Sequence, residues 1–259
     1  MQIYDSIHSC DYTVHTYDVD RYNTVYLSYF FQLMQETAAQ HSKCYHLTIS
    51  DLKVQQKTWV VIRQRLSITR YPQWLEPIQL QTWVTKPSPL IAPRSFLAID
   101  KLGNILFRGL SYWCIIDLAH HHPVPLASVY QSSGINDADR QITDPIGKPG
   151  SIPDSYTNLY TYHPSILYRD TDTNGHVNNR VYCDWCLESV PPHIRDGHNP
   201  SMFEIHYNKE TYDTDTILVK THMPADHSGG YHQIYALREG KELLVCTVKS
   251  CWEHRAALG

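Results

Sequence analysis

The chain has 259 residues, 42% of them hydrophobic and 19% charged, so it can bury one large core or two of about 130 residues each. This composition excludes a disordered chain, and 19 tyrosines spread along the sequence favour a β-rich protein over a helical bundle. A formal net charge of -4 argues against nucleic acid as the main ligand, because phosphate binding needs a basic surface.

The N-terminal segment and the cysteines bear on the cellular compartment. Residues 1–14 contain no basic stretch followed by an apolar run, so we expect no signal peptide. The most apolar stretches, such as residues 110–119, are shorter than the roughly 18 residues of a membrane helix. Seven scattered cysteines, an odd number in a chain of this length, predict reduced thiols. We therefore expect a cytoplasmic protein without a membrane span.

The first half of the chain has the pattern of one strand, one helix and four further strands. After an extended run at residues 10–17, side chains at helical spacing predict an amphipathic helix over about residues 24–42. Alternating segments then predict strands, with a turn at Gly103 and Asn104 between the last two. These strand segments are residues 58–70, 76–86, 95–101 and 105–118.

Residues 131–155 are rich in Ser, Gly, Asp and Pro and lack hydrophobic periodicity, which predicts a linker. The same order of elements follows it. An extended run at residues 159–167 precedes a helical segment through Val181 and Trp185, which Pro191 and Pro192 end. Strand segments return at residues 201–208, 215–223, 231–239 and 242–252.

This repetition indicates a tandem duplication. LMQETA at residues 33–38 aligns with WCLESV at residues 185–190, which matches Glu36 with Glu188. We predict one domain at residues 1–130, the linker at 131–155, and a second domain at 156–259. Because a helix can bury its apolar stripe against one face of an antiparallel sheet, each domain is predicted to be a long helix wrapped by such a sheet, in an α+β protein.

Residues 170–179, DTDTNGHVNN, concentrate groups that hydrogen bond or titrate just before the second helix. Such density is costly to bury without a function. If the segment is extended, Asp172, Asn174 and His176 project to one side, because side chains alternate along a strand. An acid, an amide and an imidazole would then share one small space.

The same segment carries a family resemblance. Residues 170–191, DTDTNGHVNNRVYCDWCLESVP, resemble the catalytic loop and helix of the acyl-acyl carrier protein (ACP) thioesterases, which are tandem hot-dog folds of plants and bacteria. The first half is similar to that family's N-terminal domain in LMQETAAQHS, TWVVIRQRLSITRYPQW and LQTWVTK, at residues 33–42, 58–74 and 80–86. The resemblance covers nearly the whole chain. It implies a tandem (double) hot-dog fold and a hydrolase, without cofactor or metal, that releases free fatty acid from acyl-ACP and so terminates fatty acid synthesis.

Carried over by position, the catalytic residues of that family fall on Asp172, Asn174, His176 and Glu210. In the plant pattern a cysteine follows the glutamate, whereas here the residue is Thr211. This departure favours attack by water over a cysteine nucleophile. We expect Glu210 to take a proton from water, Asn174 and His176 to position the water and the thioester carbonyl, and Asp172 to orient its neighbours.

Two further expectations concern the second helix. Backbone N–H groups near residues 177–179, at the expected start of the helix, could stabilise the oxyanion. Glu188 is the replacement candidate for the general base, although a buried helix glutamate tied to a partner group is the better interpretation, since Glu36 repeats it.

Three motifs suggest metals. DTDTNG begins like an EF-hand loop, but the twelfth position holds Val181 rather than the required glutamate. Cys183 and Cys186 lie inside a predicted helix without a second pair at zinc-finger spacing, which favours core thiols. The run of histidines at residues 120–122 precedes a proline, as exposed loop residues do.

The counterpart of the motif in the first half, DVDRYNTVY at residues 18–26, keeps Asp18 and Asp20 but has no histidine, so we expect no catalysis there. The resemblance implies instead that the first domain shapes the pocket for the acyl tail, with residues from its helix and strands. Ordinary core packing explains the same apolar residues.

The partner that the resemblance implies is acyl carrier protein, which is acidic. Residues 1–130 carry 11 Lys and Arg against 9 Asp and Glu, and residues 131–259 carry 11 against 17, so the halves have net charges of +2 and -6. An acidic partner would prefer the first half, although undirected drift of surface charge explains so small an excess equally well.

Rival functions are an acyl-CoA thioesterase of hot-dog fold and a non-catalytic module that binds acyl thioesters. Hydrolysis of one acyl chain on each donor separates them. The sequence leaves chain-length preference open, and also the choice between a monomer and a homodimer.

Overall fold

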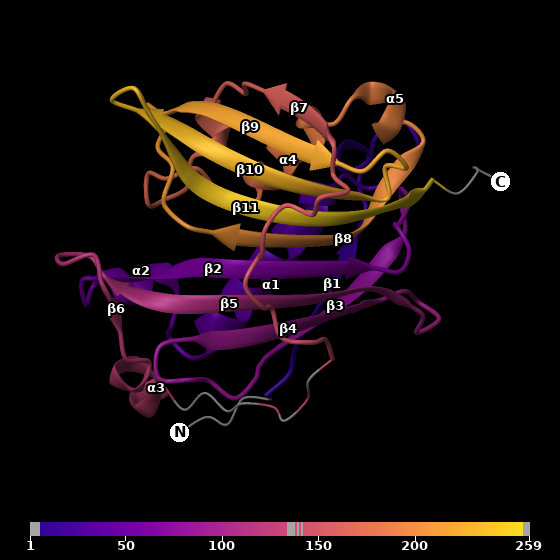
Figure 1. Cartoon of the computed structure of the whole chain (residues 1–259). Coiled ribbons are helices and arrows are strands. Elements are labelled where there is room, and N and C mark those ends of the chain that lie inside the picture. The colour runs from indigo at the N-terminus through magenta and orange to yellow at the C-terminus, as the bar shows by residue number, and fades with distance from the viewer. Residues whose placement is uncertain (1–5, 134–137, 139, 141, 256–259) are drawn as a thin grey trace. The chain divides into compact units, whose positions relative to one another are not determined.

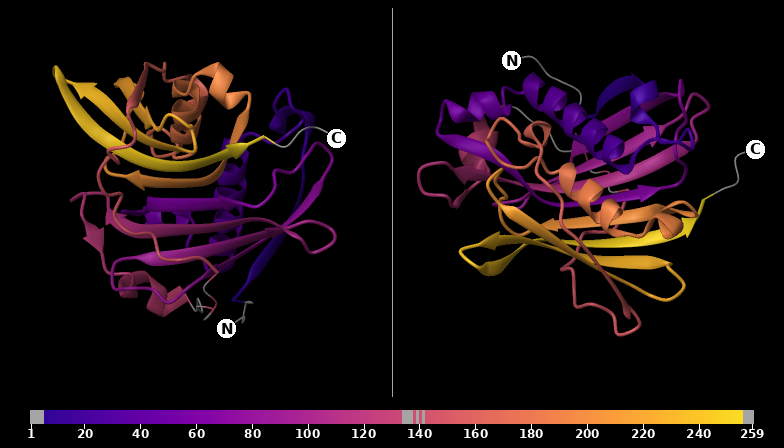
Figure 2. Two further views of the ribbon diagram at one scale, coloured as in Figure 1. Left: turned by 45° about the vertical axis from the view of Figure 1, so that its right-hand side comes forward. Right: turned by 90° about the horizontal axis from the view of Figure 1, so that it is seen from above.

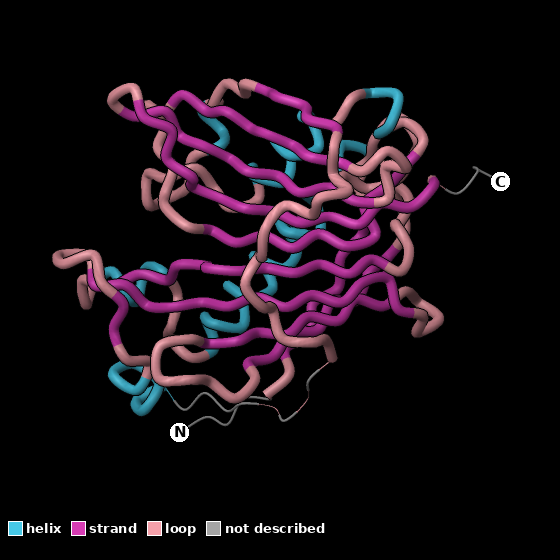
Figure 3. The backbone as a smooth tube through the Cα atoms, viewed as in Figure 1, coloured by secondary structure: helices cyan, strands magenta, loops and turns pink. Residues whose placement is uncertain are grey.

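The computed structural model describes residues 6–133, 138, 140 and 142–255 (Figure 1). The chain divides into two compact units, Met1–Ile146 and Gly147–Gly259. Each unit combines an antiparallel sheet with helices, as the strands and helices distinguished in Figure 3 show. The protein is therefore of the α+β class, as predicted.

The main helix of the first unit is α1, Leu27–Cys44, close to the range that the sequence predicted. Its buried side chains recur at helical spacing, and Phe30, Met34, Thr37 and His41 are all at most 1% exposed. This stripe faces the sheet, because α1 contacts β3 and β1 (Figure 2).

The first unit has a sheet with strand order β1-β3-β4-β5-β2, and β6 pairs with β5. Gly109 of β5 lies directly beneath α1. A Cβ atom at Gly109 would approach Met34 Sδ to 2.9 Å, so glycine lets the helix pack close to this strand. The strands are β1 His8–Thr13, β2 Lys57–Ile68, β3 Pro77–Val84, β4 Ala92–Ile99, β5 Ile105–Asp117 and β6 Pro123–Val124.

The second unit repeats this topology in the order β7-β9-β10-β11-β8. When the strands of each unit are counted in chain order, the two units have the same strand order. Every described pairing within the two units is antiparallel. The strands are β7 Asn158–Tyr162, β8 His198–Tyr207, β9 Thr216–Met223, β10 Gly229–Arg238 and β11 Lys241–His254.

The helix of the second unit, α4, spans only Val181–Ser189 and packs on β9 and β7. The prediction of a long helix in each domain is therefore wrong for the second. Pro191 prevents continuation, because the residue before a proline is biased away from helical geometry. Upstream, Asn178 Oδ1 accepts the backbone N–H of Arg180 at 3.1 Å and holds that segment in a turn.

The sequence analysis missed several short elements. In α2, Ile49–Lys53, Thr48 and Asp51 form a capping box at the start of the helix. In α5, Pro192–Arg195, the proline that ends the preceding helix opens a new one. The remaining short elements are η1 Thr16–Asp18, α3 Ala127–Ser133 and η2 Tyr168–Asp170.

Two further features bear on the sequence analysis. The seven cysteines are free thiols, as predicted. Among the helices in the described ranges, none combines the length and the apolar character that a membrane crossing requires. Residues 134–137, 139 and 141 of the predicted linker lie outside the described residues.

Candidate active site

The polar segment before α4 is a closed turn. The bridge between Thr171 and Val177 closes it, and Asp172 N–H donates to the His176 carbonyl at 2.8 Å. Gly175 has a φ of 78°, a conformation that glycine adopts without strain. The expectation of an extended segment with alternating side chains is therefore wrong.

The carboxylate of Asp172 lies within this turn. Its Oδ1 accepts the backbone N–H of Asn174 at 2.7 Å and that of His176 at 3.4 Å. Through these bonds Asp172 fixes the backbone from which the amide and the imidazole extend. Its expected role in orienting the catalytic neighbours stays a prediction.

The first unit contains the same turn. Asp20 Oδ1 accepts the N–H groups of Tyr22 and Thr24, at the same spacing as the bonds to Asp172. The bridge between Val19 and Val25 corresponds to the one that closes the second turn. Tyr22 and Thr24 thus stand where the second unit has the amide and the imidazole, so the copies share the scaffold but not the reactive groups.

Glu210 and His176 come together from separate loops. His176 Nε2 lies 3.5 Å from Glu210 Oε2, and the two side chains are 27% and 38% exposed. Glu210 lies in the loop between β8 and β9, and Val177 N–H donates to the Thr211 carbonyl at 2.8 Å. That backbone bond joins the two loops and sets the distance between imidazole and carboxylate.

Asn174 holds an unused acceptor at this site. Its Oδ1 is buried and receives no hydrogen bond within the described parts of the chain. A buried amide oxygen without a partner is costly, which points to a group held for a ligand.

Thr211 occupies the position of the cysteine in the plant pattern, but its hydroxyl is committed to the core. The side chain is fully buried, and its Oγ1 accepts the hydroxyl of Tyr182 at 2.8 Å. Burial raises the pKa of Tyr182, so this phenol keeps its proton and donates. Thr211 is therefore a structural residue rather than a nucleophile.

The sequence analysis missed three residues that surround Glu210. Tyr212 donates its hydroxyl to Glu210 Oε2 at 3.0 Å, and Arg238 donates to the Glu210 backbone carbonyl at 2.8 Å. Asp215 accepts two bonds from Arg238. Tyr212 stands two residues after Glu210 and could have been found from that spacing, whereas β10 brings in Arg238 from 28 residues away.

The expected oxyanion site at the start of the helix is wrong. Val177 N–H donates to the Thr211 carbonyl, and Asn178 N–H donates to the Asp170 carbonyl at 2.7 Å. The helix itself begins only at Val181. The N–H groups of Val177 and Asn178 are therefore occupied within the protein.

Glu188 and Glu36 both face solvent, so the expectation of buried helix glutamates is also wrong. The Glu188 side chain is 53% exposed and its Oε1 pairs with Arg195 at 2.8 Å. Glu36 accepts a bond from Gln40 at 2.8 Å. Both acids are satisfied at the surface of their helices.

The motifs that resembled metal sites have structural roles. Asp170 Oδ2 accepts the Leu167 N–H at 2.9 Å, and the histidines at residues 120–122 are exposed, as predicted. Cys183 and Cys186 are buried in α4, and burial raises the pKa of both thiols well above the ordinary value. In the part of the chain that the structure describes, no group of three or more His, Cys, Asp or Glu could hold a metal ion.

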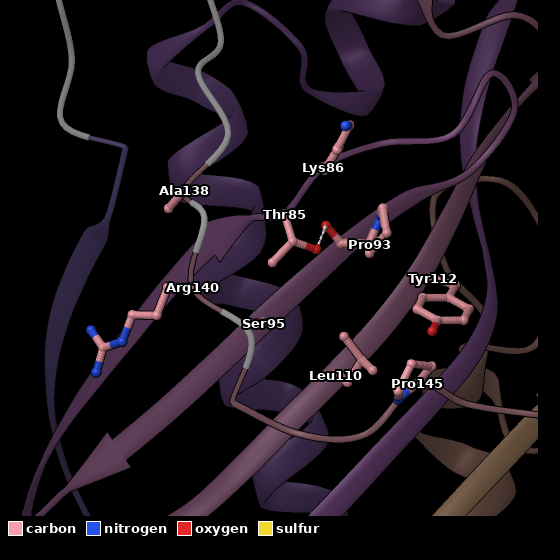
Figure 4. A pocket seen from close by; sticks show the side chains of 9 residues that line it. All are labelled: Thr85, Lys86, Pro93, Ser95, Leu110, Tyr112, Ala138, Arg140 and Pro145. Atoms are coloured by element: carbon pink, nitrogen blue, oxygen red, sulfur yellow. Dashed lines mark hydrogen bonds between the residues drawn. The ribbon is translucent and has the colours of Figure 1, made fainter.

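A pocket of about 180 Å³ lies in the first unit (Figure 4). Ser95 and Leu110, which pair across β4 and β5, line it. Their neighbours Phe96 and Gly109 lie beside Met34 of α1, so the pocket is on the opposite face of the sheet.

Ala138, Arg140 and Pro145, which follow α3 in the chain, also line this pocket. Ala138 N–H donates to the Val84 carbonyl at 2.9 Å, and Trp83 Nε1 donates to the Arg140 carbonyl at 2.7 Å. In Figure 4, Lys86 and Arg140 point away from each other and do not form a common cationic site. Since no residue of α1 lines this pocket, it differs from the acyl pocket of helix and strands that the resemblance implies, which stays a prediction.

Relatives of the chain are named as thioesterases or hydrolases of acyl carrier protein substrates. A palmitoyl-acyl carrier protein thioesterase of Cuphea hookeriana is 24% identical over 90% of this chain and 60% of its own length. A dodecanoyl-[acyl-carrier-protein] hydrolase of Cinnamomum camphora is 26% identical over 77% of this chain and 55% of its own length. Both names include the word chloroplastic. The chain thus spans little more than half the length of these relatives.

Solved structures agree over the full chain. An acyl-ACP thioesterase from Bacteroides thetaiotaomicron matches with a TM-score of 0.81 at 23% identity, and covers 98% of this chain and 100% of its own. The 12:0-ACP thioesterase from Umbellularia californica matches with a TM-score of 0.83 at 21% identity and the same coverage. These matches confirm the tandem hot-dog fold.

Two family models match successive parts of the chain. The acyl-ACP thioesterase N-terminal domain matches residues 5–130, and the acyl-ACP thioesterase C-terminal domain matches residues 156–254. The chain therefore belongs to the acyl-ACP thioesterase family.

Proposed function

We propose that this protein hydrolyses the thioester of fatty acyl-ACP to free fatty acid and holo-ACP. The observation that carries the proposal is the approach of His176 Nε2 to Glu210 Oε2, at 3.5 Å, in a chain of this family. The turn that carries His176 also carries the unused amide oxygen of Asn174. Relatives named as hydrolases of this substrate class support it.

In the proposed reaction, water attacks the thioester carbonyl while Glu210 takes a proton from that water. The tetrahedral intermediate collapses, the bond from carbon to sulfur breaks, and the pantetheine sulfur leaves as a thiolate. A free thiol has a pKa of about 8.5, so this leaving group needs little assistance. Glu210 returns the proton when the thiolate becomes a thiol.

Asn174 and His176 position the water and the thioester carbonyl. Asp172 holds these two residues in place by accepting their backbone N–H groups. Since the N–H groups of Val177 and Asn178 are occupied, we assign the oxyanion to the side-chain amide or imidazole N–H. The first predicted domain, residues 1–130, binds the acyl tail, and the second predicted domain, residues 156–259, carries the chemistry. The cytoplasmic location and a homodimer stay predictions.

The test is hydrolysis by purified protein of acyl-ACP substrates of graded chain length, with the same acyl chains on coenzyme A. We expect turnover of acyl-ACP to exceed that of acyl-CoA. Asn174→Ala and His176→Ala should each lower kcat by about 100-fold or more, as loss of a positioned catalytic group does. Faster hydrolysis of acyl-CoA would favour the coenzyme A thioesterase, and binding without hydrolysis of either donor would favour the binding module.

A further inference from the structure

We propose that Tyr212 is a positioning residue for Glu210, and that Arg238 and Asp215 hold Tyr212 in place. The proposal rests on the proposed function of Glu210 as general base. Tyr212 touches both members of the reactive pair: its hydroxyl donates to Glu210 Oε2 at 3.0 Å, and its ring packs edge-on against His176, with centroids 5.2 Å apart.

The direction of the hydrogen bond is fixed. Burial raises the pKa of Tyr212, and the hydrogen bond to Glu210 and the charge of that carboxylate raise it further. The phenol therefore keeps its proton at neutral pH and donates to the carboxylate. By donating to the carboxylate of Glu210, the Tyr212 hydroxyl stabilises its ionised form, and this is the form that can take a proton from water.

This bond also selects which oxygen of Glu210 is free. Oε2 faces both Tyr212 and His176, at 3.0 and 3.5 Å. The hydrogen bonds described for Glu210 reach Oε2 and the backbone carbonyl, and its side chain is 38% exposed. With Oε2 held, Oε1 is the oxygen available to take the proton from water.

Arg238 and Asp215 hold the tyrosine from its other sides. The Arg238 guanidinium lies 5.1 Å from the centre of the Tyr212 ring, in a cation–π contact. Asp215 Oδ2 accepts the Tyr212 backbone N–H at 2.8 Å and Arg238 Nη2 at 2.6 Å, and its side chain is only 6% exposed. Burial alone would raise the pKa of Asp215, but the hydrogen bonds from Arg238 and Tyr212 bring that pKa below its usual value. Asp215 therefore stays ionised at neutral pH.

Arg238 links this cluster back to the base. Its Nη2 donates to the backbone carbonyl of Glu210 at 2.8 Å. The backbone of Glu210 is thus held by Arg238 and its carboxylate by Tyr212. A glutamate side chain has three rotatable bonds, and restricting them keeps the carboxylate where the water must bind.

The test is a double-mutant cycle with Tyr212→Phe and Glu210→Ala, measured on acyl-ACP under steady-state and single-turnover conditions. Tyr212→Phe keeps the ring and its contacts with His176 and Arg238 but removes the donor. We expect kcat to fall about tenfold, as for loss of one hydrogen bond to a charged group, while KM changes less than about twofold. In the Glu210→Ala background the same substitution should cost nothing further.

The matched control is Tyr235→Phe on β10. That ring contacts Lys220 Nζ, 4.7 Å from the ring centre, and its hydroxyl takes no part in the site, so kcat should stay at the wild-type value. Circular dichroism and thermal melting verify that each variant is folded.

A Tyr212→Phe variant with wild-type kcat would overturn the proposal, and so would an equal loss in both backgrounds, since Tyr212 would then act independently of Glu210. An inactive wild-type protein would instead overturn the proposed function and the role of Tyr212 with it. Full activity of Glu210→Ala would leave hydrolysis standing but overturn the assignment of Glu210 as general base, and with it the role of Tyr212. If the wild type is active and the Tyr212→Phe variant is unaffected, only the proposed role of Tyr212 is overturned.

Discussion

At the scale of single residues, the candidate site separates groups that hold the backbone from groups available to a substrate. Asp172 holds the backbone, because its Oδ1 accepts two backbone N–H groups of its own turn. Asn174, His176 and Glu210 are the groups that we propose act on the substrate. Asp20 performs the backbone role in the first unit, where reactive groups are lacking.

Asp172→Ala should therefore lower both stability and turnover, whereas Asp20→Ala should lower stability alone. Each variant loses a carboxylate that accepts backbone N–H groups, which costs about 1 kcal/mol. Only at Asp172 does the released turn carry the amide and the imidazole, so only that variant should lose kcat, by about tenfold or more. Urea unfolding and acyl-ACP hydrolysis measure the two effects. Equal losses of kcat in both variants would refute the separation of roles.

A second residue, His232, should make stability depend on pH. It is fully buried, with its ring nitrogens within hydrogen-bond distance of the Thr221 and Ser250 hydroxyls at 2.7 and 3.0 Å. Burial, with a smaller effect of His222, lowers the pKa of His232 from 6.5 to about 3. Above pH 6.5 the imidazole is neutral in both states. As pH falls below 6.5, the unfolded chain takes up a proton that the folded chain refuses, until pH reaches about 3.

The folded state should accordingly lose about 2 kcal/mol between pH 7 and pH 5 through this one group. His232→Gln keeps a polar side chain that cannot titrate, so its free energy of unfolding should fall less over the same interval. Urea midpoints at the two pH values measure the difference. Parallel pH dependence in wild type and variant would contradict the assignment.

At the scale of elements, the first sheet and its helix are in close contact at Gly109. A Cβ atom there would lie 2.8 Å from Met34 Cε and 3.2 Å from Phe96 Cβ, and both neighbours are at most 1% exposed. A methyl group at Gly109 would force the end of the Met34 side chain to shift within a closely packed core.

Gly109→Ala should destabilise the protein by about 1–3 kcal/mol through overpacking. Gly147→Ala is the matched control, since a Cβ atom at Gly147 meets nothing within 4 Å. Its effect should be near zero. Chemical denaturation compares the two variants, and equal stability of both would show that α1 shifts freely on its sheet.

The elements also show why sequence patterns predict some structure and miss the rest. Long periodic segments such as α1 and the four main strands of each unit were predictable, because hydrophobic spacing marks them directly. The five-residue helix α2 has too few turns for a periodic signal. Helix α4 begins later than the expected start near residues 177–179, because Asn178 holds the preceding segment in a turn. In the site, local residues of one loop were predictable, but the pairing of β9 with β10 that brings Arg238 to Glu210 was not.

At the scale of the whole molecule, two units of one topology have diverged in function. Both have the same strand order, and both contain a turn closed around an aspartate, at Asp20 and Asp172. Only the second turn carries an amide and an imidazole and lies within reach of a carboxylate, Glu210. The proposed thioesterase activity therefore belongs to the second unit.

The most direct measurement is kcat/KM for acyl-ACP hydrolysis by Glu210→Ala, compared with Glu188→Ala. Glu188 is the matched control, since it pairs with Arg195 at the surface of α4. Loss of the general base should lower kcat/KM by about 100- to 10,000-fold, while Glu188→Ala retains the wild-type value. Near-normal turnover by Glu210→Ala would contradict the account.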